Sequence, residues 1–172
     1  MKSLLLLRHA KSSWDHPELA DHDRPLKQLG IEAAKRMGRW TLAKSLIPDR
    51  VLCSSAARTT ETWDRVRSVW ERAARTSPEV TIHPELYACS TDAIRRVIAE
   101  FGRSSQSVMV IGHNPALQDL LSQLTGVDET FPTAAFAKID LPIDDWVEIQ
   151  QSDLRGNLFR LQRPRDLDEA DR

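Results

Sequence analysis

Three short runs of apolar residues stand out along the chain, at residues 4–7, 51–53 and 108–111, and none of them alternates with polar residues. Continuous apolar runs of this length are typical of strands that are buried on both faces, as in a parallel sheet covered by helices. Weaker strand candidates follow the same reasoning. They lie at residues 80–82, 134–139, 146–149 and 158–161.

Helical periodicity lies between these runs. Four stripes of apolar residues, spaced three and four positions apart, begin at Ile31, Trp63, Ile94 and Leu117. Each stripe is expected to face the core. Strand and helix therefore alternate four times before a strand-rich end. This order predicts an α/β fold, a three-layer α/β/α sandwich with a mostly parallel central sheet.

The length of 172 residues suits one domain, which we place at residues 1–162. A chain of this size can bury roughly 70% of its unfolded surface, so it needs no metal or disulfide to hold it together. The hydrophobic fraction of 41% excludes wholesale disorder. Residues 163–172 are charged and are expected to form a frayed tail.

The formal net charge of −1 limits the classes of partner that are expected for this protein. A general nucleic-acid binder usually has a basic excess, so none is expected here, and a bound anion must be held by a local cluster of cations. No apolar run approaches the ~20 residues of a membrane span. The two cysteines, Cys53 and Cys89, do not suggest a disulfide framework. The default expectation is a cytoplasmic protein without membrane contact.

Candidate chemistry follows the three apolar runs. Arg8 and His9 come after the first run, Arg58 lies about one helical turn beyond the second, and His113 comes after the third. In open α/β sheets, ligands bind beyond the carboxyl ends of the strands, so these four side chains are expected to meet. The helix that begins near Ser55 would add backbone N–H groups and a positive dipole end. The set is rich in donors and predicts a site for a tetrahedral dianion.

The residue types indicate phosphoryl chemistry. Guanidinium groups match phosphate oxygens, and a neutral imidazole is a competent nucleophile near pH 7. Two arginines beside such an imidazole would stabilise the transferring phosphoryl group and lower the pKa of the ring. For His113 alone, capping of a strand end is the alternative interpretation. The convergence of all four side chains favours a site.

Four segments, in this order along the chain, resemble motifs of the histidine phosphatase superfamily, the phosphoglycerate-mutase-like proteins. They are residues 8–10 (RHA, where the family usually has R-H-G), 24–33 (RPLKQLGIEA), 54–62 (SSAARTTET) and 112–115 (GHNP). Residues 8–14 and 84–87, together with the compact length, look most like the SixA-type phosphohistidine phosphatases.

The resemblance implies a mechanism. His9 attacks phosphorus and becomes a phosphohistidine, which water then hydrolyses, while Arg8, Arg58 and His113 bind the phosphoryl group. No metal or other cofactor is implied. The expected substrate is a phosphohistidine on a protein domain, with a small phosphorylated molecule as the alternative.

Several further roles stay open. Glu85 stands where mutase-like members place their general acid, but Asp23 competes for that role. An imidazole leaving group could also depend little on any donor. Ser55 either contacts phosphate or caps a helix, and Arg24 either contacts phosphate or anchors a loop. Lys11 either adds charge to the site or is a solvated loop residue.

Three other functions compete with this interpretation. Residues 53–58 spell C-x4-R, one residue short of the C-x5-R loop of cysteine-dependent phosphatases, and Cys53 lies in a predicted buried strand. A phosphate-binding or phosphoprotein-binding module without catalysis would not need His9. A mutase would need an enclosed pocket, and the short span from Arg58 to Tyr87 leaves little room for the inserted segments that usually build one.

Overall fold

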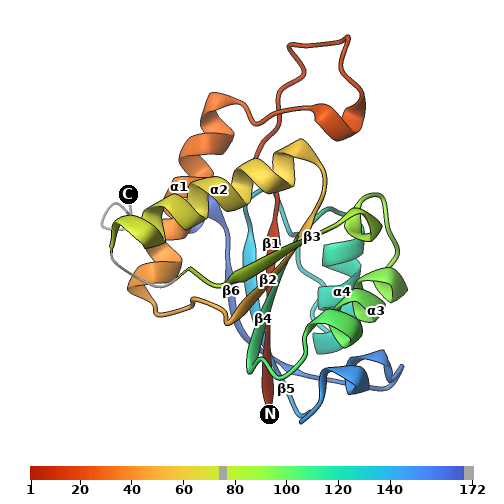
Figure 1. Ribbon diagram of the computed structural model, residues 1–172. Helices are drawn as coiled ribbons and strands as arrows, with labels where there is room; N and C mark the ends of the chain where they lie inside the picture. The colour runs from red at the N-terminus through yellow and green to blue at the C-terminus, as the bar shows by residue number, and fades with distance from the viewer. Residues whose placement is uncertain (74–76, 169–172) are drawn as a thin grey trace.

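The computed structural model describes residues 1–73 and 77–168 (Figure 1). The strands are β1 (Lys2–Arg8), β2 (Arg50–Ser54), β3 (Glu79–His83), β4 (Ser107–Gly112), β5 (Phe136–Leu141) and β6 (Asn157–Gln162). The helices are α1 (Gln28–Ala43), α2 (Ala57–Arg72), α3 (Thr91–Phe101) and α4 (Ala116–Thr125), and the short 3-10 turns are η1 (Asp21–Asp23), η2 (Pro84–Leu86), η3 (Trp146–Gln150) and η4 (Pro164–Asp166). Within the described ranges, no helix combines the length and the apolar character that crossing a membrane requires.

The strands form one sheet in the order β3-β2-β4-β1-β5-β6. Strands β1 to β4 are parallel where they pair, and β5 is antiparallel to both of its neighbours. The mostly parallel α/β sandwich predicted from the sequence is therefore confirmed. The carboxyl ends of β1, β2 and β4 lie side by side at one edge of the sheet.

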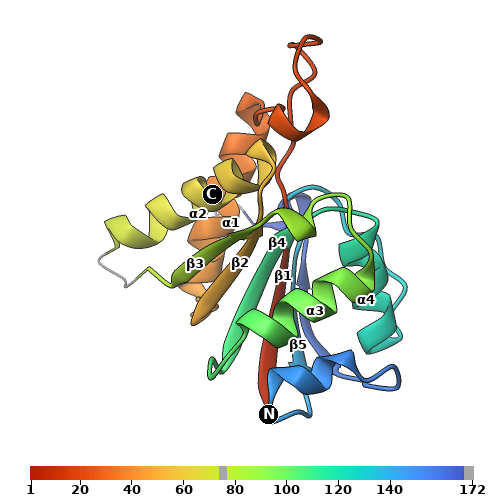
Figure 2. The ribbon, with the colours of Figure 1, turned by 45° about the vertical axis from the view of Figure 1, so that its right-hand side comes forward.

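Helices α1 and α2 cover one face of the sheet, and α3 and α4 cover the other (Figure 2). Leu4 and Leu6 of β1 belong to the apolar cluster under α3 and α4, whereas Leu5 and Leu7 belong to the cluster under α1 and α2. All four are at most 2% exposed. Since both faces are covered, every position of the run at residues 4–7 is buried, and this explains why the apolar run is continuous.

Residues 146–149, expected as a strand, instead form most of η3, so that prediction is wrong. The Asp145 side chain accepts a hydrogen bond from the Val147 N–H, and the Glu148 side chain accepts one from the Asp145 N–H. This reciprocal arrangement is a capping box, and it starts a helical turn rather than a strand. The fully buried Trp146 of η3 then packs in the apolar cluster under α3 and α4.

The expected fraying of the C-terminal segment is also wrong over residues 163–168. Leu167 is 5% exposed and packs in the cluster under α1 and α2. Arg163 pairs with Glu129 at 2.7 Å. These contacts hold η4 against the body of the molecule. Residues 169–172 lie outside the described residues.

Residues 10–27, here called the projecting segment, leave the sheet after β1 and extend beyond the body of the molecule (Figures 1 and 2, the red to orange excursion). Hydrogen bonds close its base, from the Lys27 N–H to the Lys11 carbonyl (3.0 Å) and from the Ser13 N–H to the Pro25 carbonyl (2.8 Å). Gly30 of α1 lies against this base, and a Cβ there would come within 2.2 Å of the Lys11 oxygen. The glycine therefore lets α1 approach the segment that follows β1.

Candidate active site

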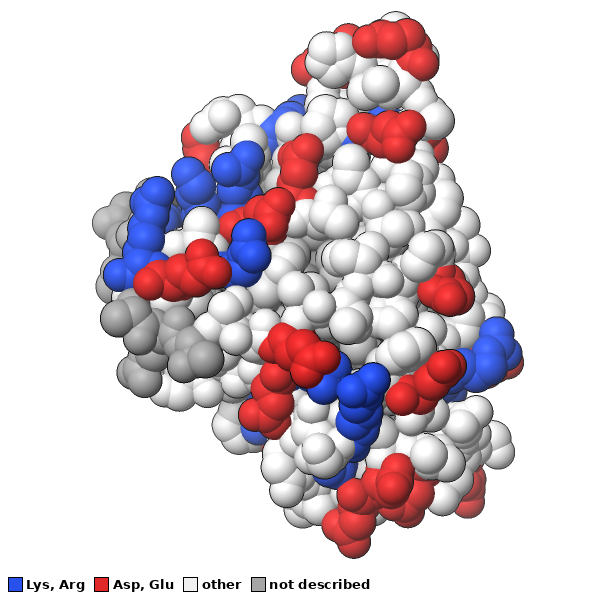
Figure 3. Space-filling model, in the orientation of Figure 1, with Lys and Arg blue, Asp and Glu red and all other residues white. Residues whose placement is uncertain are grey.

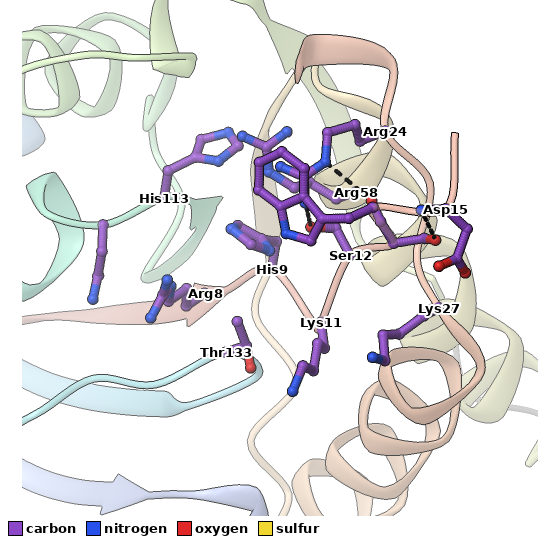
Figure 4. A pocket seen from close by; sticks show the side chains of 13 residues that line it. Arg8, His9, Lys11, Ser12, Asp15, Arg24, Lys27, Arg58, His113 and Thr133 are labelled. Atoms are coloured by element: carbon purple, nitrogen blue, oxygen red, sulfur yellow. Dashed lines mark hydrogen bonds between the residues drawn. The ribbon is translucent and has the colours of Figure 1, made fainter. Parts of the chain in front are cut away.

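A pocket of about 470 Å³ lies beyond the carboxyl ends of β1 and β4 (Figure 4). Five residues predicted from the sequence line it: Arg8, His9, Arg24, Arg58 and His113. Arg8 ends β1 and His9 follows it, Arg58 lies in the first turn of α2, and His113 follows β4. The structure thus brings together residues that are far apart in the sequence.

His9 is 8% exposed, and its Nδ1 lies 2.8 Å from the carbonyl oxygen of Ala10. A carbonyl oxygen only accepts hydrogen bonds, so Nδ1 holds the proton of the neutral ring and the lone pair is left on Nε2. Burial lowers the pKa of His9 to about 4, and the charges of Arg58, Arg8 and Arg24 add to this effect although the bond to Ala10 opposes it. At pH 7 the ring is neutral and its Nε2 is free to act as a nucleophile.

The His113 ring lies 5.2 Å from that of His9, measured between centroids. Its Nε2 is 2.8 Å from Ser54 Oγ, and Ser54 is fully buried. Burial lowers the pKa of His113 to about 3, with further contributions from His9 and Arg58. Its Nδ1 is buried and has no hydrogen-bond partner among the described residues. A buried polar atom of this kind is stabilised when a ligand supplies its partner.

The two predicted phosphate-binding arginines differ in how they are held. Arg58 donates from Nη1 to the Asp21 carbonyl (2.7 Å) and from Nη2 to the Asp21 carboxylate (3.1 Å). Arg8 donates from Nη1 to the Phe131 carbonyl at 3.1 Å, while its buried Nε has no partner in the described part of the chain. Burial lowers the pKa of Arg8, and the nearby charge of Arg58 adds to this. Both guanidinium groups retain donors for an anion.

Arg24 lines the pocket, and each of its three guanidinium nitrogens already donates one hydrogen bond. Its Nε donates to the Ser13 carbonyl (3.0 Å), its Nη1 to Asp21 Oδ1 (2.9 Å) and its Nη2 to Ser12 Oγ (2.7 Å). Two of these partners belong to the opposite side of the projecting segment. Arg24 thus anchors the projecting segment, while its contact with phosphate stays a prediction.

Asp21 was not singled out from the sequence, yet it links the cations of the site. Its carboxylate accepts hydrogen bonds from Arg24, Arg58 and the Tyr87 hydroxyl (2.7 Å). The bond from Tyr87 is the largest of the effects that lower the pKa of Asp21 to about 2, followed by the contacts with the two arginines. Asp21 is therefore ionised at neutral pH. The only sequence signal was its place in the same acidic stretch as Asp23.

The structure does not bring Glu85, Asp23 or Ser55 into the pocket. Glu85 is exposed in η2, and Asp23 is exposed beside His22, with 3.2 Å between Oδ1 and the His22 Nδ1. Ser55 Oγ lies 2.9 Å from the His22 Nε2. Helix capping by Ser55 is not observed either, because Ala56 occupies the N-cap position of α2. Neither carboxyl group considered as a general acid lines the pocket.

Lys11 and Lys27 extend the positive charge of the pocket wall (Figure 4). Together with the three arginines they face one acidic lining residue, Asp15. The face of the molecule in Figure 3 differs, since there Lys and Arg are interspersed with Asp and Glu. Sequence reasoning missed Lys27 and Thr133 because both lie in irregular segments. Across residues 1–73 and 77–168, no three His, Cys, Asp or Glu side chains gather as metal ligands would.

Cys53 is fully buried and does not line the pocket. It packs in the cluster under α1 and α2, and burial raises the pKa of its thiol to about 12. A thiol of this kind is almost entirely protonated at neutral pH. These observations exclude Cys53 as a nucleophile in this pocket.

Comparisons with known proteins agree with this geometry. The family model of the histidine phosphatase superfamily (branch 1) matches residues 4–87. A solved structure assigned to the phosphohistidine phosphatase SixA of Nakamurella multipartitia has a TM-score of 0.81 and 26% identity, covering 95% of this chain and 96% of that one. A second SixA assignment, from Agrobacterium tumefaciens, has a TM-score of 0.79 and 25% identity, covering 95% and 98%. The uncharacterized protein Rv1276c of Mycobacterium tuberculosis is 30% identical over 155 residues, covering 84% of this chain and 92% of the relative.

The α/β fold and the cationic pocket around a buried histidine define a phosphatase. The chain belongs to the histidine phosphatase superfamily, in its SixA-type branch.

Proposed function

We propose that the protein hydrolyses phosphohistidine on a protein substrate and that His9 is the nucleophile. The observation that carries the proposal is the state of the His9 ring. It is neutral, its proton is held on Nδ1 by the Ala10 carbonyl, and its Nε2 lies in a pocket lined by cations. The similarity to structures assigned as phosphohistidine phosphatases supports the choice of substrate.

In the first step, the phosphoryl group binds among Arg8, Arg58 and His113. Phosphoryl oxygens would supply the missing partners of Arg8 Nε and His113 Nδ1. His9 Nε2 attacks phosphorus, a P–N bond to His9 forms, and the P–N bond of the substrate breaks with its electron pair going to the substrate ring. A substrate ring that has a proton on its other nitrogen leaves as neutral imidazole.

This leaving group requires little help from an acid, and the placement of the carboxyl groups is consistent with that. Glu85 and Asp23 lie outside the pocket, and the low pKa of Asp21 keeps it ionised. A general acid gives the largest benefit when the leaving group is a poor one, such as an alkoxide. The site is thus better suited to a phosphoramidate than to an unactivated phosphoester.

In the second step, water attacks the phosphorus of phospho-His9. The P–Nε2 bond breaks and its electron pair returns to Nε2. The phosphorylated ring is positively charged while Nδ1 keeps its proton, so it too leaves as a neutral imidazole. The protons of the water remain with the released phosphate or pass to solvent. The arginines stabilise charge on the phosphoryl oxygens in both steps.

The test compares turnover of a phosphohistidine protein, free phosphohistidine and a panel of phosphomonoesters by the wild type, His9→Ala and Cys53→Ser. We expect a preference of several orders of magnitude for phosphohistidine, loss of activity in His9→Ala and near-normal activity in Cys53→Ser. Equal rates on phosphomonoesters would indicate a general phosphomonoesterase. Tight binding of vanadate without turnover of any substrate would indicate a binding module.

A further inference from the structure

Trp14 is 76% exposed and lines the same pocket as His9. Other large apolar side chains are exposed in the described part of the chain, including Ile82, Val147 and Phe159, but none of those lines this pocket. An indole left in solvent at the mouth of a polar pocket is a candidate contact for a ligand, because burying it on binding is favourable.

The indole is held in place on one side. The Arg24 guanidinium carbon lies 3.2 Å from the centroid of the Trp14 ring. Arg24 is itself 7% exposed and fixed by its bonds to Ser12, Ser13 and Asp21. One face of the indole therefore rests on an immobilised cation, while the high exposure of the side chain leaves the other face open. A ring ordered before binding costs little entropy when a ligand stacks on it.

The position of Trp14 relative to His9 indicates which part of a substrate it meets. Both residues line the pocket, but His9 is 8% exposed and Trp14 is 76% exposed, so His9 lies on the buried side of the pocket and Trp14 on its solvent side. In an in-line displacement, the leaving group departs on the side opposite the nucleophile. A phosphoryl group attacked by His9 Nε2 therefore directs its leaving group toward the mouth.

We propose that Trp14 is a specificity-determining residue whose open face stacks on the imidazole ring of a phosphohistidine substrate. The inference rests on the proposed function and deepens it by assigning a contact to the leaving group. An aromatic face attracts a flat ring, and more strongly so when that ring is protonated and positively charged, as the departing imidazole is before the P–N bond breaks. Stacking on Trp14 therefore favours the binding of phosphohistidine over that of a phosphoryl donor without a ring.

The test uses two substrates with a P–N bond, free phosphohistidine and phosphoramidate, of which only the first has a ring. We expect Trp14→Ala to lower kcat/KM for phosphohistidine roughly three- to tenfold more than for phosphoramidate, mainly through KM. Trp14→Phe keeps an aromatic face and should restore most of the preference. Phe159→Ala is the matched control, because Phe159 is also an exposed aromatic residue (54%) with a cation over its ring, Lys138 Nζ at 4.2 Å, but lies outside the pocket.

Equal effects of Trp14→Ala on the two substrates, or no effect on either, would overturn the stacking role and leave the proposed function intact. A Phe159→Ala variant that changed the preference as much as Trp14→Ala would overturn it too. The wild type is also assayed on a phosphohistidine protein. Failure to hydrolyse that protein as well as both small P–N substrates would instead overturn the proposed function, and the role of Trp14 with it.

Discussion

The hydrogen bond from His9 Nδ1 to the Ala10 carbonyl fixes the tautomer of the proposed nucleophile. We expect ¹⁵N NMR spectra of the imidazole groups to show His9 as the Nδ1–H tautomer at pH 7. We also expect its titration midpoint well below the ordinary value of about 6.5, since burial and the neighbouring arginines place the pKa near 4. The His9→Gln variant identifies the signals. A midpoint near 6.5, or a proton on Nε2, would contradict the proposed nucleophile.

The low pKa of Asp21 separates a positioning role from a proton-donating one. Asp21→Asn weakens the contacts that hold Arg58 and Arg24. Because the Asp21 carboxylate is 50% exposed, solvent screens these ion pairs to about 1 kcal/mol or less, so kcat/KM should fall by about fivefold or less. The loss of kcat/KM in Asp21→Asn should be similar for substrates with good and poor leaving groups. Glu85→Gln should stay close to wild type. A loss of about a hundredfold or more, concentrated on poor leaving groups, would reveal a general acid instead.

The sequence alone predicted the site residues that lie beside strands and helices, but not all of those that lie in irregular segments. Arg8, His9 and His113 lie at the ends of strands and Arg58 lies in the first turn of a helix, so the topology alone brings them together. Asp21 and Trp14 lie in the projecting segment, where no periodicity fixes the path of the chain. Their positions depend on side-chain hydrogen bonds and stacking around Arg24, and these become visible only in the structure.

At the scale of elements, the approach of α1 to the projecting segment depends on Gly30. We expect Gly30→Ala to lower the melting temperature by several degrees, because a Cβ placed 2.2 Å from the Lys11 carbonyl oxygen forces backbone apart at a cost of about 1–3 kcal/mol. This cost exceeds the gain of up to about 1 kcal/mol that alanine brings to a helix. Thermal unfolding followed by circular dichroism measures the change.

Gly38→Ala is the matched control, since Gly38 lies in the same helix and the nearest atom to its added Cβ would be 3.1 Å away. A smaller loss of stability is expected there. Activity should fall in Gly30→Ala alone, because Lys11 follows His9 and Ala10 directly and a shift of Lys11 disturbs the carbonyl that holds the His9 ring. Equal behaviour of the two variants would argue against this link between α1 and the site.

The elements themselves were predictable where their burial is uniform. The run at residues 4–7 indicates a strand covered on both faces, and β1 has that environment. The strand predicted at residues 146–149 failed because Asp145 and Glu148 form a capping box, a signal that was present in the sequence and outweighed the apolar character of Trp146 and Val147. Leu167 was misjudged because a single apolar residue in a charged stretch gives no periodicity.

At the scale of the whole molecule, the site is a consequence of strand order. Strand β4 lies between β2 and β1 and is parallel to both. Arg8 pairs in register with Gly112, and the His9 N–H donates to the Gly112 carbonyl at 3.1 Å. His9 and His113 therefore extend from adjacent strand ends, and Ser54, at the end of β2, reaches the His113 ring from the other side. Three separate parts of the chain thus build the proposed active site.

The most direct test of the central claim is to trap the phosphorylated enzyme. The protein is mixed with a labelled phosphohistidine substrate, quenched rapidly in alkali, and the label is located by peptide mapping. We expect an acid-labile, alkali-stable phosphate on His9 in the wild type and none in His9→Gln. Label on any other residue of the chain, or unchanged labelling and turnover in His9→Gln, would contradict the account.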